Sequence, residues 1–196
     1  STNDLSAVVV VYYDKGRNII YVEGKGWISE RALTESIIAR ELLECRDRGE
    51  LVVSEGDRID YSSIANFIAS RWQQGRSVIY IDPYQAQALV AELERVIGVY
   101  GADVIEVNQS SATMDQLVRK TQLLANHYGI PHGPNRLLEI CLANTAIREN
   151  RRGHLSLARL REKIPIDMSV ALVLVLIPAV EKPTEVSAPA VEAWIF

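Results

Sequence analysis

Short apolar runs alternate along this chain with segments whose apolar residues recur at helical spacing. Residues 5–13 form a β-branched run, residues 14–18 have turn chemistry, and strand character resumes over 19–23. This pattern predicts a β-hairpin at the start of the chain. Because its first strand is almost continuously apolar, we expect that strand inside the sheet and without a solvent face.

The remaining pattern predicts strands and helices in alternation. Strands are expected at residues 51–53, 77–81 and 103–107, with a second hairpin pairing 145–148 and 154–157. Helices are expected at 29–48, 60–75, 86–97, 114–127 and 134–142, before a last buried helix that Asp167 opens. Together these elements predict one α/β domain over residues 1–180, with a mixed β-sheet flanked by helices. Residues 181–196 are expected to form a C-terminal tail, in which 194–196 are apolar enough to dock.

Composition narrows the function. The 196 residues carry a net charge of −4, so any binding of nucleic acid must depend on a local basic patch. Two cysteines without zinc-ligand spacing indicate a reducing setting, not a disulfide framework or a zinc site. The apolar segment 168–180 is shorter than the roughly 20 residues of a membrane span, so no membrane role is expected. The chain has no GxxxxGK[ST] loop, so it contains no ATP-driven motor of that type.

Two carboxylates end or begin buried elements. Asp82 follows the apolar run 77–81, and strand alternation places it on the face of Val78 and Tyr80. Asp167 opens the last buried helix. Because the ends of strands are where open α/β sheets bind ligands, the pair suggests an Mg²⁺ or Mn²⁺ site. The structural alternatives are an Asp-Pro turn at Asp82 and a helix N-cap at Asp167.

The motifs around these carboxylates resemble the nuclease domain of the large terminase subunit of tailed bacteriophages. The similar segments are Ile79-Tyr80-Ile81-Asp82-Pro83, Lys163-Ile164-Pro165-Ile166-Asp167 with the following Val170-Ala171-Leu172, and the helix-to-strand segment that contains Leu138, Cys141 and Asn144. The resemblance extends from Ser1 to about Leu176. The order of the motifs carries more weight than any one of them.

The resemblance implies a ribonuclease H-like fold with an extra β-hairpin before the last helix. It also implies a metal-dependent endonuclease that cuts concatemeric double-stranded DNA during phage packaging. In the two-metal mechanism, one Mg²⁺ or Mn²⁺ ion activates water and the other stabilises the leaving 3′ oxygen. Asp82, Asp167 and Asp4 are the implied catalytic and metal-binding residues. The implied partners are an N-terminal ATPase motor, the small terminase subunit and the portal, in the cytoplasm of a bacterial host.

In this family a first catalytic Asp lies on the first strand, shortly before a Ser/Thr-rich turn and a second Asp. Ser1-Thr2-Asn3-Asp4 resembles that turn and second Asp. Either the first strand and its carboxylate precede Ser1, which we prefer, or Asp4 takes the role itself. In the first case this chain lacks one metal ligand and an edge of its sheet. We then expect the chain by itself to cleave DNA poorly.

Basic residues concentrate shortly before the last helix. The six are Arg148, Arg151, Arg152, Arg159, Arg161 and Lys163. The resemblance places part of this set on a hairpin beside the active site, where arginines could contact phosphates without reading sequence. Arg159 or Lys163 could also stabilise charge at the scissile phosphate. The alternative is a solvated hairpin tip.

Two other functions remain open. The domain could be a non-catalytic module that grips DNA and docks within the packaging machine, with its acidic residues serving as caps and turns. It could also be another ribonuclease H-like nuclease, such as a transposase or a Holliday-junction resolvase. The segment with Cys141 and Asn144 and the basic hairpin favour a terminase.

Overall fold

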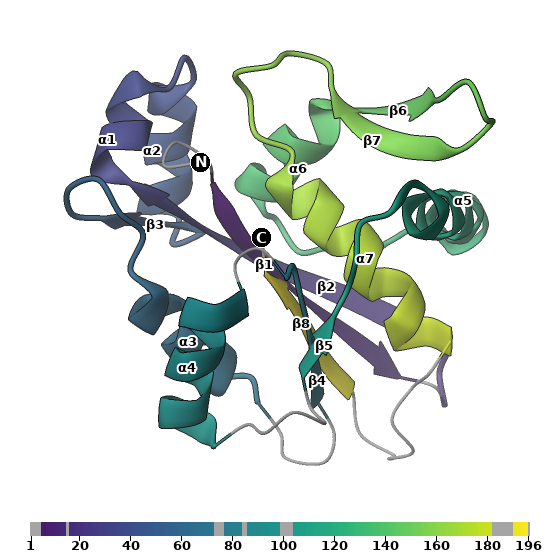
Figure 1. Ribbon diagram of the computed structural model, residues 1–196, viewed down its shortest axis with the longest axis horizontal. Coiled ribbons are helices and arrows are strands. Elements are labelled where there is room, and N and C mark those ends of the chain that lie inside the picture. Colours follow the sequence, from purple (N-terminus) through teal and green to yellow (C-terminus); the bar gives the residue numbers. More distant parts are fainter. Residues whose placement is uncertain are drawn as a thin grey trace.

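A mixed β-sheet forms the centre of the molecule (Figure 1). The computed structural model describes residues 5–14, 16–72, 77–83, 86–98, 104–181 and 190–195. Within these residues the strands of the main sheet follow the order β3-β2-β1-β8-β4-β5. Their bounds are β1 (Ser6–Asp14), β2 (Ile19–Ser29), β3 (Leu51–Ser54), β4 (Ser77–Ile81), β5 (Val104–Glu106) and β8 (Ala190–Ile195).

The expected hairpin at the start of the chain is confirmed. β1 and β2 pair antiparallel from Ser6 opposite Trp27 to Asp14 opposite Ile19. The turn places Asn18 in the left-handed region with φ 54°, which Asn tolerates better than most residues. β1 has β2 on one side and β8 on the other, and its first six residues are buried. This interior position explains why its sequence is apolar without alternation.

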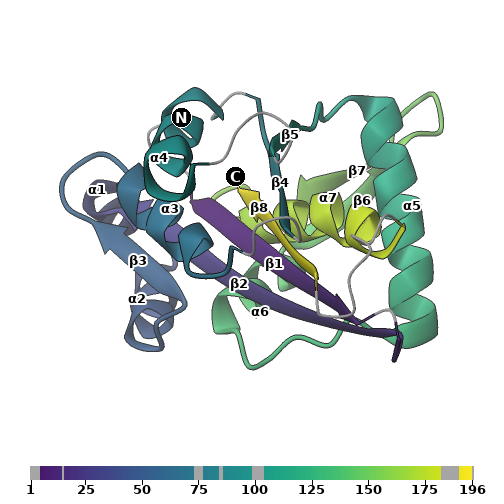
Figure 2. The ribbon, with the colours of Figure 1, turned by 90° about the horizontal axis from the view of Figure 1, so that it is seen from below.

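Helices cover both faces of the sheet (Figures 1 and 2). α5 (Ser111–Tyr128), α6 (Arg136–Ala143) and α7 (Asp167–Glu181) pack on one face, and α3 (Tyr61–Ala69) and α4 (Ala86–Ile97) on the other. Alternate residues of β1 divide between the two cores: Ala7 and Val9 face α7, whereas Val8 and Val10 face α3 and α4. The sheet therefore separates two hydrophobic cores.

The single helix expected over residues 29–48 is wrong. The structure has two helices there, α1 (Glu30–Glu35) and α2 (Ala39–Asp47). Ser36 is extended, with φ −73° and ψ 135°, and its hydroxyl accepts a hydrogen bond from the backbone N–H of Ile38 at 3.3 Å. An extended residue cannot continue the helical hydrogen-bond ladder, so the helix ends there and restarts after Ile38.

Residues 190–195, expected in a C-terminal tail, form β8 in the interior of the sheet. β8 pairs antiparallel with β1 and parallel with β4, so that Ile195 lies between Val8 and Ile81. β1 therefore has a neighbouring strand on both sides. The segment contains Val191, Trp194 and Ile195, residue types that favour strands.

The second expected hairpin and the last buried helix are confirmed. β6 (Thr145–Glu149) and β7 (Leu155–Arg159) form a separate antiparallel sheet, and β7 packs against α5. α7 is apolar on nearly all sides and contributes ten buried residues to the core. Within the described residues, no helix combines the length and the apolar character that crossing a membrane requires.

Candidate active site

Asp82 lies directly after the end of β4 and is half-buried. Strand alternation gives it the same face as Val78 and Tyr80, whose side chains pack in the core beside α7. The Nε2 of Gln109 donates a hydrogen bond of 2.6 Å to Asp82 Oδ2. β5 runs parallel to β4, so the residues that follow both strands meet at one edge of the sheet. The neighbouring strand thereby holds the Asp82 carboxylate in place.

Asp167 is the first residue of α7 and is also half-buried. The positive end of the helix dipole favours a negative charge at this position. A hollow of about 350 Å³ opens beside it. Its wall includes Leu5, Glu35, Arg159, Glu162, Lys163 and Asp167. The hollow therefore joins the beginning of β1 to the beginning of α7.

Asp82 follows a strand whose Val78 and Tyr80 pack on the α7 face of the sheet, and Asp167 begins α7 itself. Because β1 is antiparallel to β8 and β8 is parallel to β4, the end of β4 lies level with the beginning of β1. Only β8 lies between these two strands. The backbones of β1 and β4 are therefore about 10 Å apart, which is twice the spacing of neighbouring strands. Leu5, which immediately precedes β1, lines the hollow of Asp167 and packs in the core on the α7 face. Figure 1 shows the beginnings of β1 and α7 at the upper end of the sheet.

The described residues supply fewer than three ligands at this edge. Nowhere among them do three His, Cys, Asp or Glu side chains come close enough to hold a metal ion. Asp4, the third expected ligand, immediately precedes Leu5 and lies outside the described residues. The expected first strand before Ser1 lies outside the chain itself.

Arg159 lies at ion-pair distance from the Asp167 carboxylate. Its Nη2 lies 3.8 Å from Asp167 Oδ2, at ion-pair distance but beyond a hydrogen bond. The Oδ2 atom is itself buried, whereas the Arg159 side chain is 35% exposed. The guanidinium therefore reaches both the carboxylate and the open hollow.

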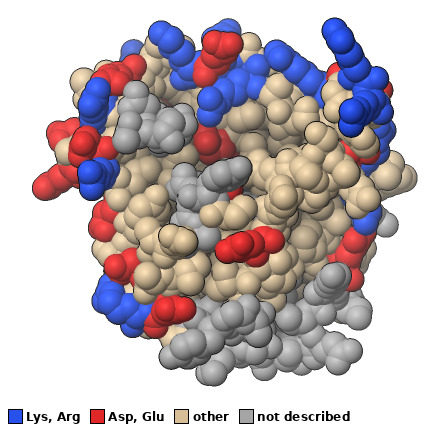
Figure 3. All heavy atoms as spheres, in the orientation of Figure 1, with Lys and Arg blue, Asp and Glu red and all other residues tan. Residues whose placement is uncertain are grey.

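The six basic residues form two groups. The hairpin arginines (Arg148, Arg151 and Arg152) are exposed on β6 and its turn, and the last two line a shallow hollow at the beginning of α5. The loop cations are Arg159, the last residue of β7, and Arg161 and Lys163, which follow it. Arg159 and Lys163 line the Asp167 hollow, and Arg161 lines a neighbouring one. Figure 3 shows Lys and Arg side chains along the upper rim of the molecule, over the hairpin and the loop after it.

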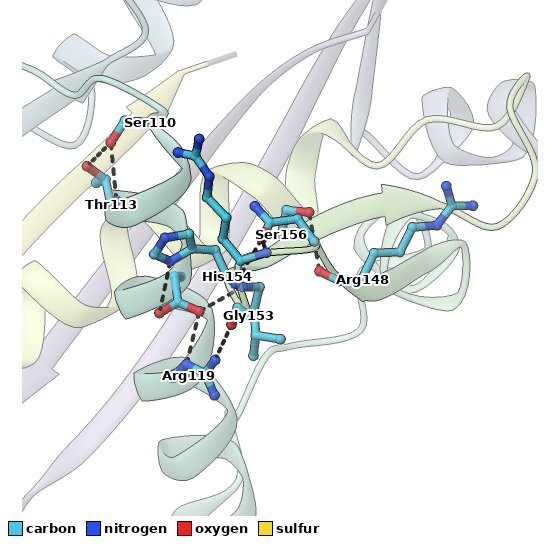
Figure 4. Close-up of polar contacts among 11 residues, drawn as sticks. Ser110, Thr113, Arg119, Arg148, Gly153, His154 and Ser156 are labelled. Atoms are coloured by element: carbon cyan, nitrogen blue, oxygen red, sulfur yellow. Dashed lines mark hydrogen bonds and ion pairs between the residues drawn. The ribbon is translucent and has the colours of Figure 1, made fainter.

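The hairpin is fixed to α5 through Asp115. This carboxylate accepts hydrogen bonds from the backbone N–H of Leu155 at 2.7 Å and from Arg119 Nε at 2.9 Å, and pairs with His154 at 3.8 Å. Arg119 also donates to the Gly153 carbonyl at 2.8 Å (Figure 4). The Leu155 N–H, followed by Arg119, lowers the pKa of Asp115, so this attachment is intact at neutral pH. It is lost only as the pH falls through that lowered pKa.

The sequence of the chain matches the family described as terminase large subunit, endonuclease domain, over residues 1–182. The chain belongs to this family. Among solved structures, the HK97 bacteriophage large terminase is similar, with a TM-score of 0.71 and 21% sequence identity. The match covers 87% of this chain and 36% of that one. A search of curated proteins finds no match.

The structural likeness confirms the predicted fold. This terminase domain has the mixed sheet and flanking helices of the ribonuclease H-like nuclease domain, with the β6–β7 hairpin before the last helix. Membership in the terminase family decides against a transposase or a resolvase. The domain spans about a third of the length of the solved terminase, which extends well beyond the matched region.

Sequence reasoning missed several polar residues around the site. Gln109 has no motif, although its place just after β5 marks it as a neighbour of Asp82 once the two strands are known to be parallel. Glu35 reaches the hollow from α1, and that helix was expected to continue past it. Asp115 lies within an ordinary amphipathic helix, and its contacts with the hairpin leave no signal in the sequence.

Proposed function

We propose that this terminase domain is an Mg²⁺- or Mn²⁺-dependent endonuclease that hydrolyses phosphodiester bonds of concatemeric double-stranded DNA. One observation supports the proposal above others: Asp82 follows β4, and Asp167, far from it in sequence, begins the helix α7 that packs on the Tyr80 face of that strand. Arg159 and Lys163 line the hollow beside Asp167, where a phosphate would find positive charge.

The chemical type of the side chains at this site suits Mg²⁺ or Mn²⁺. Carboxylate oxygens are the ligands that Mg²⁺ and Mn²⁺ prefer, and both acidic residues sit at the ends of rigid elements. Asp82 and Asp167 would hold the metal, with Asp4 as the third candidate. When bound, a pair of such ions supplies an activated water and stabilises the leaving 3′ oxygen.

Other residues would hold the metal ligands in place and bind the phosphate. Gln109 fixes the rotamer of Asp82 through its 2.6 Å hydrogen bond. The beginning of α7 stabilises the charge on Asp167. Arg159 lies 3.8 Å from Asp167 and would move to bind a phosphate oxygen of the DNA. It would then stabilise the negative charge that develops on that phosphate during cleavage.

Crystals soaked in Mn²⁺ would test the proposal directly. We expect anomalous density for manganese between Asp82 and Asp167, together with Mn²⁺-dependent cleavage of plasmid DNA by the full-length protein. Asp60, an exposed N-cap bonded to Ser62, is an internal control and should carry no density. Carboxylates that stay more than about 8 Å apart, without an ion, would contradict the proposal, because shared ions need near contact.

A second candidate is a DNA-gripping module that does not cut. The hairpin arginines favour it, because they lie on a hairpin anchored to α5 and apart from the Asp167 hollow. We assign them to phosphate contacts in either case. The proposed setting is the packaging machine in the cytoplasm of a bacterial host, where an ATPase motor, a small terminase subunit and a portal would be the partners of the full protein.

The hairpin arginines give a prediction about salt. Replacing Arg151 and Arg152 together by Ala should weaken binding to a random duplex and reduce the slope of log K against log salt by about 1.8, roughly 0.9 per lost phosphate contact. The matched control replaces Arg40 and Arg46 on α2, which removes the same charge. Fluorescence anisotropy over a range of salt concentrations provides the measurement. Equal slopes for both double variants would show that the hairpin makes no special contact.

A further inference from the structure

Asn144 is a buried polar residue to which the function above gives no role. It ends α6 immediately before β6 and is 5% exposed. The sequence singles it out as part of a segment similar to terminases, without saying what it does. A buried amide is costly unless its donors and acceptor are all used, so its contacts indicate what it holds.

All of those contacts go to the loop between β7 and α7. Asn144 Nδ2 donates to the carbonyls of Ile164 at 2.8 Å and Arg161 at 3.1 Å, and Oδ1 accepts from the Arg161 N–H at 2.9 Å. The backbone carbonyl of Asn144 accepts from the Leu160 N–H at 2.8 Å. One residue therefore fixes four backbone groups of this loop.

The loop leads directly into Asp167. It carries Lys163, which lines the hollow beside Asp167. The same helix, α6, also packs against the start of α7, where Cys141 and Met168 are both fully buried in the core. The end of α6 thus bonds the loop before Asp167 and packs beside the residue after it.

We propose that Asn144 is a positioning residue that sets the place of Asp167 and Lys163 at the metal and phosphate site. The proposal rests on the function proposed above. It requires both amide protons, because they bond two carbonyls, and an aspartate of the same shape could donate neither. It also requires the carbonyl oxygen for the Arg161 N–H.

Asn135 provides a matched control at the opposite end of α6. Its Oδ1 accepts from the Leu138 N–H at 2.9 Å and its Nδ2 donates to the Gly24 carbonyl at 2.7 Å. Asn135→Ala therefore removes side-chain-to-backbone bonds of the same kind, but none from the loop before Asp167. A loss of stability alone would affect both positions.

The experiment compares Asn144→Asp, the milder Asn144→Ser and Asn135→Ala in the full-length protein. Thermal unfolding reports stability, hydrogen exchange reports the amide of Arg161, and calorimetry reports affinity for Mn²⁺. We expect all three variants to lower Tm. Both Asn144 variants should weaken Mn²⁺ binding by roughly 10- to 100-fold, as lost supporting contacts do at metal sites. Asn144→Ser should also speed exchange at Arg161 by roughly tenfold, because its shorter side chain removes the acceptor of the Arg161 N–H, which Asn144→Asp retains.

The outcomes separate the two proposals. Equal weakening of Mn²⁺ binding by Asn135→Ala, or unchanged exchange and affinity in Asn144→Ser, would overturn the positioning role. If the unchanged protein binds no Mn²⁺, the proposed nuclease fails, and the positioning role at a metal site fails with it. Faster exchange at Arg161 in that case would leave Asn144 as a structural anchor of the loop only.

Discussion

Replacing Asp167 by Asn should reduce Mn²⁺-dependent cleavage of plasmid DNA by the full-length protein by more than about 100-fold. The substitution keeps the shape of the side chain and removes the charge that the start of α7 and Arg159 face. A direct metal ligand should matter more than the supporting contacts whose loss costs roughly 10- to 100-fold at metal sites. Asp82→Asn should have an effect of the same order, because it faces the same edge of the sheet.

The control for this pair is Asp47→Asn. Asp47 is exposed on α2 and pairs with Arg46 at 2.8 Å, so its loss changes net charge equally without touching the site. Thermal unfolding of each variant shows whether a loss of cleavage reflects a loss of fold. Full cleavage by both Asp82→Asn and Asp167→Asn would place the chemistry elsewhere and leave the DNA-gripping module as the better account.

The candidate site could be proposed from the sequence because its acidic residues end or begin strongly patterned elements. Asp82 follows a β-branched run and Asp167 precedes an apolar helix, and both boundaries are local features. Which residues surround them is a tertiary property. Gln109 reaches Asp82 only because β5 is parallel to β4, and Arg159 reaches Asp167 only because β7 leads back toward α7. Neither arrangement can be predicted from the local spacing of apolar residues.

A single residue, Ser36, decides the break in the helix that the sequence predicts over residues 29–48. A helical pattern runs through residues 29–48, yet Ser36 adopts an extended conformation and divides it. Ser and Asn side chains can accept hydrogen bonds from backbone N–H groups in place of the regular backbone partners. Ser36 does so for Ile38, and Asn144 does so for Arg161. Such choices depend on what packs nearby and not on average propensity.

The division of the basic residues refines the expected DNA-binding surface. The sequence predicts one patch from Arg148 to Lys163, whereas the structure separates the hairpin arginines from the loop cations. Arg159 and Lys163 line the hollow of Asp167, whereas Arg151 and Arg152 line a separate one. DNA binding along the hairpin and cleavage at the hollow would then depend on different side chains. The salt dependence of DNA binding is therefore tested with the Arg151 and Arg152 variants, and the cleavage rate with the Asp82 and Asp167 variants.

Introducing proline at Ala193 should destabilise the domain by about 3 kcal/mol or more, with a fall in Tm of about 6–12 °C. Ala193 lies in β8 between Val10 of β1 and Ile79 of β4, in the interior of the sheet. Proline there removes a ladder hydrogen bond and clashes with a neighbouring strand. The loss would weaken the strand that connects the β3-β2-β1 half of the sheet to β4 and β5.

The control is a proline where the backbone accepts one. Ser111→Pro places it at the first position of α5, after Ser110, whose φ of −61° and ψ of 153° suit a residue before proline. Thermal unfolding by circular dichroism should separate the two variants clearly. If Ala193→Pro left Tm unchanged, residues 190–195 would not hold the interior strand position in solution. The C-terminal segment would then be the tail that its composition of Pro, Ala, Ser and Glu predicts, and β1 would present an open edge beside the site.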